Sequence, residues 1–310
     1  MSVCLPAREC AATVGGIVTE LLALRDMGAI DEVVVVDAAS SDGTAEVAER
    51  AGAIVWQEAE LMPAHGAVLG KGDAMWRALS ALGGELVCFL DADTEGFSAH
   101  FATGLLGPLV CEPDVSFVKA FYRRPFPDVA VDGGRADGGG QPDGGGRADA
   151  GGHADGGGPP DGGGRTDAGG DADAGRQSDR GGQPDGGGRV NHLMARPALE
   201  LFYPELAGVR QPLAGEVAAR RELLDGLPFA TGYGVEIAML IDVWQKIGLE
   251  GIAQVDLEEH RNHHRPLSEL TPMALTVLAT IARRLAREGR AVDVEGAPVE
   301  RPPLASVTVA

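Results

Sequence analysis

The sequence predicts an α/β fold in which parallel strands form a sheet that helices cover on both faces. Two runs support this most strongly: Glu32–Asp37 (EVVVVD) and residues 85–90 (ELVCFL) are apolar almost throughout, as strands buried on both faces are. Each is flanked by stretches with apolar residues at helical spacing. Acidic residues follow both strands: Asp37 ends one, and Asp91 and Asp93 come after the other. Ligands of such sheets bind at the carboxyl ends of the strands, so we expect a site there.

The other elements continue this alternation of strands and helices. In the N-terminal block we expect strands at 1–5, 32–37, 53–56 and 85–90, and helices at 11–27, 44–51 and 73–82. In the C-terminal block we expect helices at 190–201, 216–225, 235–248 and 272–288, and a strand at 251–255. A Pro-rich tail, 291–310, follows the last helix.

A Gly-rich insert separates the two blocks. Residues 132–188 contain 24 of the 46 glycines of the 310-residue chain, and from Asp143 to Asp185 an Asp recurs every six residues. This period is neither the nine-residue repeat of calcium-binding β-rolls nor the three-residue repeat of collagen. The insert carries no large apolar side chain that could offset the entropy of ordering it. We therefore predict that residues 132–185 are disordered.

Charge and composition exclude several classes of protein. The formal net charge is −20, which argues against binding to nucleic acid or to an anionic membrane. No apolar run approaches 18 residues, and the first residues contain no signal-type hydrophobic segment. The four cysteines lack C-x-x-C spacing, so neither a zinc site nor a disulfide framework is indicated. We expect a cytoplasmic protein.

Five patterns could carry chemistry. Asp91 and Asp93 could hold a hard divalent cation that neutralises a diphosphate, although a solvated strand end would look the same. Lys71, between two glycines at a helix start, could bind an anion, or the turn could be a simple cap. Arg189 follows three glycines and precedes a helix, as a second anion site would, but similar tripeptides fill the repeat. The run from 260 to 265 (HRNHHR) could bind an anion or a metal, or be a solvated loop. Glu236 begins an apolar helix, either as a site carboxylate or as a dipole partner.

Taken in order, the motifs of this chain closely resemble those of the actinobacterial glucosyl-3-phosphoglycerate synthases. The matching segments are LPAR, VVVVDAASSDGT, GKGDAMWRAL, CFLDAD, VKAFYRRPF, GGGRV, ARPALELFYPEL, QPLAGE, LPFATGYGVEIAMLID and IAQVDL, which span nearly all of the chain outside the insert. The resemblance implies a retaining hexosyltransferase of the GT-A fold. Such an enzyme transfers glucose from UDP-glucose to the 2-hydroxyl of 3-phosphoglycerate, depends on Mg²⁺ or Mn²⁺ and is a homodimer. Its product feeds glucosylglycerate and methylglucose lipopolysaccharide synthesis.

The resemblance also assigns roles by position. Residues 1–131 would form the nucleotide-sugar-binding region, and 186–290 the acceptor-binding and C-terminal helical region. Asp93 and Glu236 would be catalytic, with Asp93 and His264 binding the metal. The nucleotide-sugar-binding positions are Pro6, Ala7, Glu9, Ala38, Lys71, Asp91, Ala92, Leu213 and Tyr233. The acceptor-binding positions are Gly188, Arg189, Asn191, His260 and Asn262. The acceptor would attack from the face that UDP leaves, with the β-phosphate helping to remove its proton, so no protein nucleophile is needed.

Some positions depart from the family pattern and leave alternatives open. The acid of the first loop is shifted to Glu9, and Ala38 replaces a Ser that would bond to the nucleotide. Matching by H-R-N makes His260 the metal ligand, whereas a gapless match favours His264. A mannosyl-3-phosphoglycerate synthase and a catalytically weakened homologue are the nearest alternatives. A sugar-phosphate nucleotidyltransferase fits less well because its first loop would be Gly-rich, and a structural protein built around the repeat would leave the motifs without a role.

Overall fold

The computed structural model describes residues 1–124, 188–261, 266–290 and 299–307, all within one compact unit. The described segments before and after the insert therefore belong to the same compact unit. The disordered segment predicted for 132–185 lies outside the described residues, and so do Asn262 and His264.

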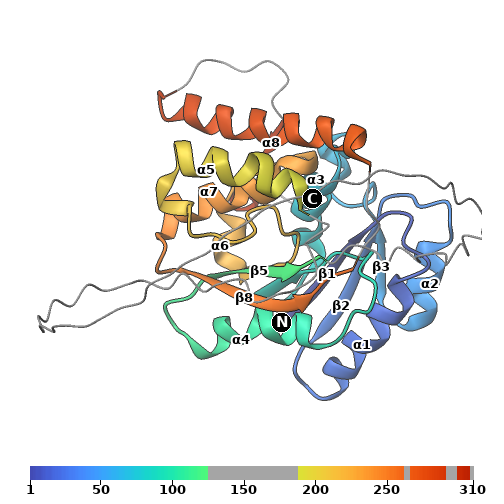
Figure 1. Cartoon of the computed structure of the whole chain (residues 1–310). Coiled ribbons are helices and arrows are strands. Elements are labelled where there is room, and N and C mark those ends of the chain that lie inside the picture. The colour runs from blue at the N-terminus through green and yellow to red at the C-terminus, as the bar shows by residue number, and fades with distance from the viewer. Residues whose placement is uncertain (125–187, 262–265, 291–298, 308–310) are drawn as a thin grey trace, which may run out of the picture. The chain divides into compact units, whose positions relative to one another are not determined.

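A seven-stranded sheet forms the centre of this unit, in the order β3-β2-β1-β4-β6-β5-β8 (Figure 1). The strands are β1 (Ser2–Ala7), β2 (Glu32–Asp37), β3 (Ile54–Gln57), β4 (Leu86–Phe89), β5 (Phe117–Arg123), β6 (Val217–Arg220) and β8 (Ile252–Glu259). Strands β1, β2, β3 and β4 pair in parallel, and so do β5 and β8. The predicted parallel sheet is thus mostly confirmed. The exception is β6, which runs antiparallel to both β4 and β5.

The helix predicted over residues 216–225 is wrong in its first half. Val217–Arg220 is strand β6, and only Arg221–Asp225 (α6) is helical. Ala218 and Ala219 are fully buried in the centre of the sheet. A run of four residues carries too little periodicity to separate a strand from a helical turn, so its place between two other strands decides its conformation.

Helices cover both faces of the sheet (Figure 1). One face packs against α1 (Val14–Asp26) and α4 (His100–Cys111), with α2 (Thr44–Ala51) beside α1. The other packs against α3 (Lys71–Ala78), α6 and α7 (Val235–Ile247). A third apolar cluster joins α7 to α5 (Arg196–Phe202) and α8 (Leu267–Arg287). Among the described residues, no helix is both long enough and apolar enough to cross a bilayer.

Most predicted helices are confirmed, with shifted ends. The helix predicted over 190–201 opens with a π-helical turn, Asn191–Ala195, before α5. The last helix begins at Leu267 rather than at 272, and Pro272 lies inside it. Helix α4 was not predicted.

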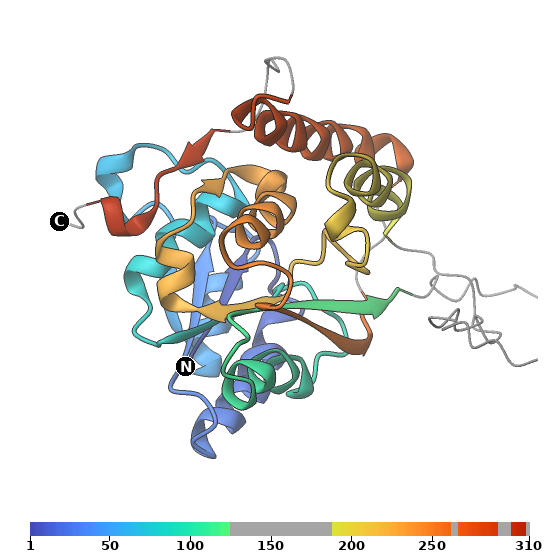
Figure 2. The same ribbon diagram turned by 90° about the vertical axis from the view of Figure 1, so that its left-hand side faces the viewer.

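The C-terminal segment returns to the body of the protein. Strand β9 (Glu300–Arg301) pairs antiparallel with β7 (Phe229–Ala230). Leu304 is buried in the same apolar cluster as α3 and α7. Figure 2 shows this red segment beside the light-blue chain that precedes α3. The described part of the Pro-rich tail is therefore an integral part of the fold.

Candidate active site

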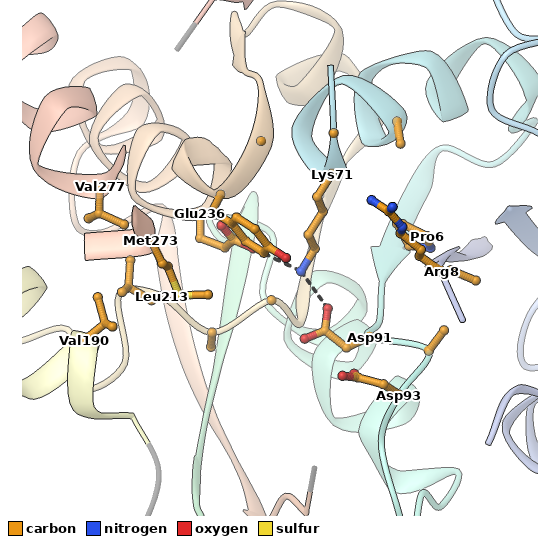
Figure 3. Close-up of a pocket in the computed structure, with 18 of the residues that line it drawn as sticks. Pro6, Arg8, Lys71, Asp91, Asp93, Val190, Leu213, Glu236, Met273 and Val277 are labelled. Carbon is orange, nitrogen blue, oxygen red and sulfur yellow. Dashed lines mark hydrogen bonds and ion pairs between the residues drawn. The ribbon is translucent and has the colours of Figure 1, made fainter. Parts of the chain in front are cut away.

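A cavity of about 670 Å³ lies at the carboxyl edge of the sheet, where the loops after β1, β2 and β4 meet α3, α7 and α8. In Figure 3, Lys71, Asp91 and Glu236 lie between Pro6 and Arg8 on one side and Leu213 and Val190 on the other. The structure brings most of the predicted site residues to this cavity: Pro6, Ala7, Ala38, Lys71, Asp91, Ala92, Asp93, Gly188, Arg189, Asn191, Leu213, Tyr233 and Glu236.

Lys71 is the central cation of the cavity. It begins α3 after Gly70, whose φ of 85° is readily adopted by glycine. Its Nζ lies 2.6 Å from Asp91 Oδ1 and 3.0 Å from Glu236 Oε1 (Figure 3). Burial alone would lower the pKa of Lys71, but the charges of Asp91 and Glu236 raise it well above its usual value. Lys71 therefore stays protonated. Its two ion pairs link Asp91, which follows β4, to Glu236 of α7.

Gly215 lets the loop 211–215 lie against this ion pair. A Cβ atom at this position would lie 2.5 Å from Asp91 Oδ1 and 2.6 Å from Lys71 Nζ, closer than van der Waals contact allows. The loop is held from below by Lys119 of β5, whose buried Nζ donates a hydrogen bond of 2.8 Å to Ala214 O. Burial lowers the pKa of Lys119 to about 8. Neither Gly215 nor Lys119 was assigned a role from the sequence.

The segment after β4 presents two carboxylates to the cavity. Its backbone is held by hydrogen bonds from Thr13 Oγ1 to Ala92 O (2.6 Å) and from Thr94 Oγ1 to Asp91 O (3.1 Å). Desolvation in the cavity and the charge of Asp91 raise the pKa of Asp93. An added positive charge would relieve the repulsion between these two carboxylates, as expected of a cation-binding pair.

Beneath the cavity, His260 and Glu216 form a buried pair. Their Nε2 and Oε1 atoms are 2.8 Å apart, and Thr94 Oγ1 lies 3.0 Å from the same His260 nitrogen. The ring of Tyr122 stacks on the imidazole with centroids 4.5 Å apart, and its hydroxyl donates to Glu216 Oε2. Burial opposes ionisation of Glu216, but the charge and hydrogen bond of His260, with Arg124 and Lys71 nearby, hold its pKa well below the usual range. Glu216 is thus a buried carboxylate that stays ionised.

These groups fit a divalent cation. Asp91, Glu216 and His260 each offer one ligand atom, and the three atoms lie within 4.8 Å of one another. His260 Nδ1 is buried and has no hydrogen-bond partner among the described residues, so one ring nitrogen is available. Oxygen ligands with one imidazole suit Mn²⁺ or Mg²⁺. Sequence reasoning missed Glu216. It placed His260 among the acceptor contacts, with metal binding as the alternative; the structure buries His260 outside the cavity lining and groups it with Asp91 and Glu216.

Besides Arg8 of the first loop, two arginines line the cavity, Arg124 and Arg189. Arg124 follows β5 and donates a hydrogen bond of 2.7 Å to the Tyr122 hydroxyl. Arg189 follows Gly188, whose φ is 72°, and Asn191 accepts a bond from Leu213 N through Oδ1. The buried Nδ2 of Asn191 has no hydrogen-bond partner in the described part of the chain. This region can therefore donate several hydrogen bonds to an anion. Sequence reasoning did not single out Arg124, although the run F-Y-R-R-P contains it.

In the first loop, the expected acid points elsewhere. Glu9 is exposed, adopts a φ of 55°, and its Oε1 accepts a bond of 2.9 Å from Ser41 N. It joins the loop to the start of α2 and does not line the cavity, whereas Arg8 and Cys10 do. Ala38 lines it too, and its N–H donates to Ala7 O. At position 9 the backbone directs the carboxylate of Glu9 toward Ser41 and away from the cavity.

Comparisons with known proteins agree with this arrangement. The family model of glycosyl transferase family 2 matches residues 2–120. A glucosyl-3-phosphoglycerate synthase of Mycolicibacterium paratuberculosis is 39% identical over 286 residues, which make up 92% of this chain and 72% of that protein. The chain belongs to the glucosyl-3-phosphoglycerate synthase family.

Further family members and structures extend the comparison. A glucosyl-3-phosphoglycerate synthase of Petrotoga mobilis is 35% identical over 261 residues, and the chain spans 84% of its own length and 65% of that protein. The Mycobacterium tuberculosis enzyme, solved with Mn²⁺, UDP and glucosyl-3-phosphoglycerate, has a TM-score of 0.73 at 34% identity, with 98% and 90% of the chains covered. A mannosyl-3-phosphoglycerate synthase of Rubrobacter xylanophilus has a TM-score of 0.75 at 40% identity, covering 99% and 88%. The fold is therefore that of a GT-A glycosyltransferase.

Proposed function

We propose that this chain transfers glucose from UDP-glucose to the 2-hydroxyl of 3-phosphoglycerate with retention of configuration, using Mg²⁺ or Mn²⁺. The observation that carries the proposal is a single cavity that joins the Lys71, Asp91 and Glu236 cluster to the guanidinium groups of Arg124 and Arg189. A family member of 34% identity binds Mn²⁺, UDP-glucose and phosphoglyceric acid in one crystal.

The donor would lie on the side of Pro6, Ala7 and Ala38, where the cavity wall is backbone and small side chains. Lys71, whose pKa is raised by the two carboxylates beside it, begins α3 and would bind the diphosphate. Asp91 would lie by the ribose, and Leu213 and Tyr233 would surround the glucose. Glu236, the carboxylate nearest to Lys71 after Asp91, would accept hydrogen bonds from the sugar hydroxyls.

The cluster of Asp91, Glu216 and His260 would hold the cation, together with Asp93 beside it. Asp93 lies in the cavity next to a second carboxylate, and the charge of His260 acts on it. A bound cation neutralises the diphosphate and so stabilises the leaving UDP. His264, favoured by the gapless match, lies outside the described residues.

The acceptor would bind through Arg189 and Arg124, which can pair with its phosphate and carboxylate groups, and through Gly188 and Asn191. In the transfer, the bond from glucose C1 to the β-phosphate oxygen breaks and the bond from C1 to the acceptor 2-oxygen forms on the same face. The proton of the acceptor hydroxyl passes to the departing phosphate. The enzyme contributes orientation and charge rather than a covalent intermediate.

A matrix of donors and acceptors tests the proposal. Purified protein with Mn²⁺ is mixed with UDP-glucose or GDP-mannose and with 3-phosphoglycerate or glycerol 3-phosphate, and the anomer formed is read by NMR. We expect α-linked glucosyl-3-phosphoglycerate as the main product. Transfer from GDP-mannose alone would contradict the donor assignment and favour the activity named for the relative of 40% identity. No transfer from either donor would contradict the proposal itself.

We also propose a homodimer in the cytoplasm. Helix α8 carries exposed leucines, with Leu267, Leu275 and Leu278 each at least 45% exposed, and Leu201 of α5 is 72% exposed. A second copy could cover these side chains. Light scattering after size exclusion measures the mass, and a monomer at micromolar concentration would contradict the dimer.

A further inference from the structure

The C-terminal strand contacts two helices that line the cavity, α3 and α8, and it pairs with β7, the strand that leads to α7. We define the C-terminal clasp as residues 299–302, a segment that no sequence motif assigned to function. Its backbone extends β7, since β9 pairs with Phe229–Ala230 and Thr231 N donates to Val299 O at 2.8 Å. Strand β7 leads directly into the turn that carries Tyr233 and into Glu236 of α7.

The Arg301 side chain reaches helix α3 and the loop that precedes it. Its Nε donates to Asp73 Oδ1 at 2.6 Å and one terminal nitrogen to Asp73 Oδ2 at 2.8 Å, while the other donates to His65 O at 2.7 Å. Asp73 is fully buried in the first turn of α3, two residues after Lys71. Burial opposes its ionisation, but hydrogen bonds from Arg301 and Leu69 N lower the pKa of Asp73.

Arg77 completes this cluster from the other side. It is buried, its Nε lies 3.3 Å from Asp73 Oδ1, and it donates to Leu61 O and Gly66 O at 2.7 Å each. Residues 61–67 form the loop that leads to Gly70 and Lys71. Five of its carbonyls accept hydrogen bonds from the two arginines that meet at Asp73: those of Leu61, Met62, His65, Gly66 and Ala67. Because this loop has little regular structure of its own beyond one 3-10 turn, these bonds fix its path.

The remaining contacts of the clasp join it to helix α8 and to Trp76 of α3. Glu300 is 2.6 Å from Arg284 of α8, the helix that contributes Leu270, Met273 and Val277 to the cavity. Pro302 O accepts a hydrogen bond of 2.7 Å from Trp76 Nε1 of α3. Figure 2 shows the clasp (red) between α8 and the chain before α3.

We propose that the clasp positions Lys71 relative to Glu236, and that Arg301 is a positioning residue for donor binding. The 3.0 Å distance between these two side chains depends on the relative placement of α3 and α7, and the clasp is bonded to α3 through Asp73 and to the start of α7 through β7. The inference rests on the proposed function only in naming the donor as a nucleoside diphosphate sugar.

The test compares Arg301→Gln with Arg301→Lys and with the control Arg287→Gln. Arg287 also pairs with Glu300, but it is half exposed and Arg284 still holds Glu300 without it. Calorimetry measures the Kd of UDP with Mn²⁺, and kinetics the two KM values. We expect Arg301→Gln to weaken UDP binding and to raise the donor KM by about tenfold, since charge-assisted bonds to a buried partner are lost. The acceptor KM and the control should stay within about twofold, and Arg301→Lys, which keeps the charge beside Asp73, should fall between them.

Hydrogen exchange provides a readout that does not depend on activity. In Arg301→Gln the amides of residues 61–70 should exchange faster, whereas those of β1 and β2 should not change. Unchanged UDP affinity with a lower melting temperature would overturn the proposal and leave Arg301 a stabilising residue only. If the wild-type protein binds no UDP, the proposed function fails instead, and the exchange of residues 61–70 still decides whether the clasp holds this loop.

Discussion

Gly215 is where the backbone of the loop 211–215 comes closest to the central ion pair of the cavity. A Cβ atom there would lie 2.5 Å from Asp91 Oδ1 and 2.6 Å from Lys71 Nζ, whereas non-bonded carbon and oxygen atoms require more than 3 Å. In Gly215→Ala, either the loop moves outward or the Lys71–Asp91 bond of 2.6 Å opens. The loop resists an outward movement because the buried Lys119 side chain donates a hydrogen bond to Ala214 O.

The expected loss follows from the bond that opens. A charge-assisted hydrogen bond in a partly buried site contributes about 1.5–3 kcal/mol, which corresponds to about a 10- to 150-fold change in an equilibrium or rate constant. We therefore expect Gly215→Ala to lower kcat/KM for UDP-glucose by about one to two orders of magnitude. Steady-state kinetics at saturating 3-phosphoglycerate measures this loss, and circular dichroism measures the melting temperature.

Gly208→Ala is the matched control, since nothing lies within 4 Å of the Cβ that it adds. Its kinetics should stay within about twofold of wild type. If Gly215→Ala keeps its kcat/KM, the reasoning is refuted: either the added methyl group does not disturb the Lys71–Asp91 pair, or this pair does not support transfer. If both variants lose activity equally, the loss has another cause than the contact with the ion pair.

Three further outcomes are expected. Asp93→Asn should lose nearly all turnover and Mn²⁺ dependence while keeping its melting temperature, whereas Asp171→Asn, with the same local D-x-D spacing in the repeat, should behave as wild type; equal effects would contradict the metal assignment. Arg189→Lys should raise the acceptor KM far more than the donor KM, because lysine cannot make a bidentate bond to a carboxylate or phosphate; a change in the donor KM alone would contradict this. Deleting residues 137–183 should leave a folded, active enzyme that is no less stable, since loop-closure entropy grows only logarithmically with length and the insert itself costs about 1–2 kcal/mol; loss of folding would show that the repeat is structured.

The central strands could be predicted because their sequences allow few alternatives. The strand Glu32–Asp37 has the predicted bounds, since four consecutive valines fit a strand buried on both faces and little else. The edge of the sheet that carries the acidic residues could also be predicted, because the carboxyl ends of parallel strands lie at one edge. The family motifs then assigned roles to positions such as Leu213 and Tyr233 that no local pattern marks.

The parts that could not be predicted depend on long-range pairing. Strand β6 is inserted antiparallel between two strands that lie far from it in the sequence, and its four residues do not encode that place. Glu216 precedes this strand, so its burial against His260 was hidden by the same error. Arg301 is separated from Asp73 by more than two hundred residues, and a lone arginine in a Pro-rich tail has no pattern that points to a buried partner.

The charges of the cavity would favour binding of a diphosphate together with a cation. Lys71 is held between Asp91 and Glu236, so a diphosphate that binds Lys71 competes with two carboxylates for the same ammonium group. Asp93 and Glu216 add further negative charge near the place where the diphosphate would lie. A dianionic or trianionic ligand would be repelled there unless a divalent cation entered with it. The carboxylates would then have the cation as their counter-charge, and Lys71 would be available to bind the phosphate.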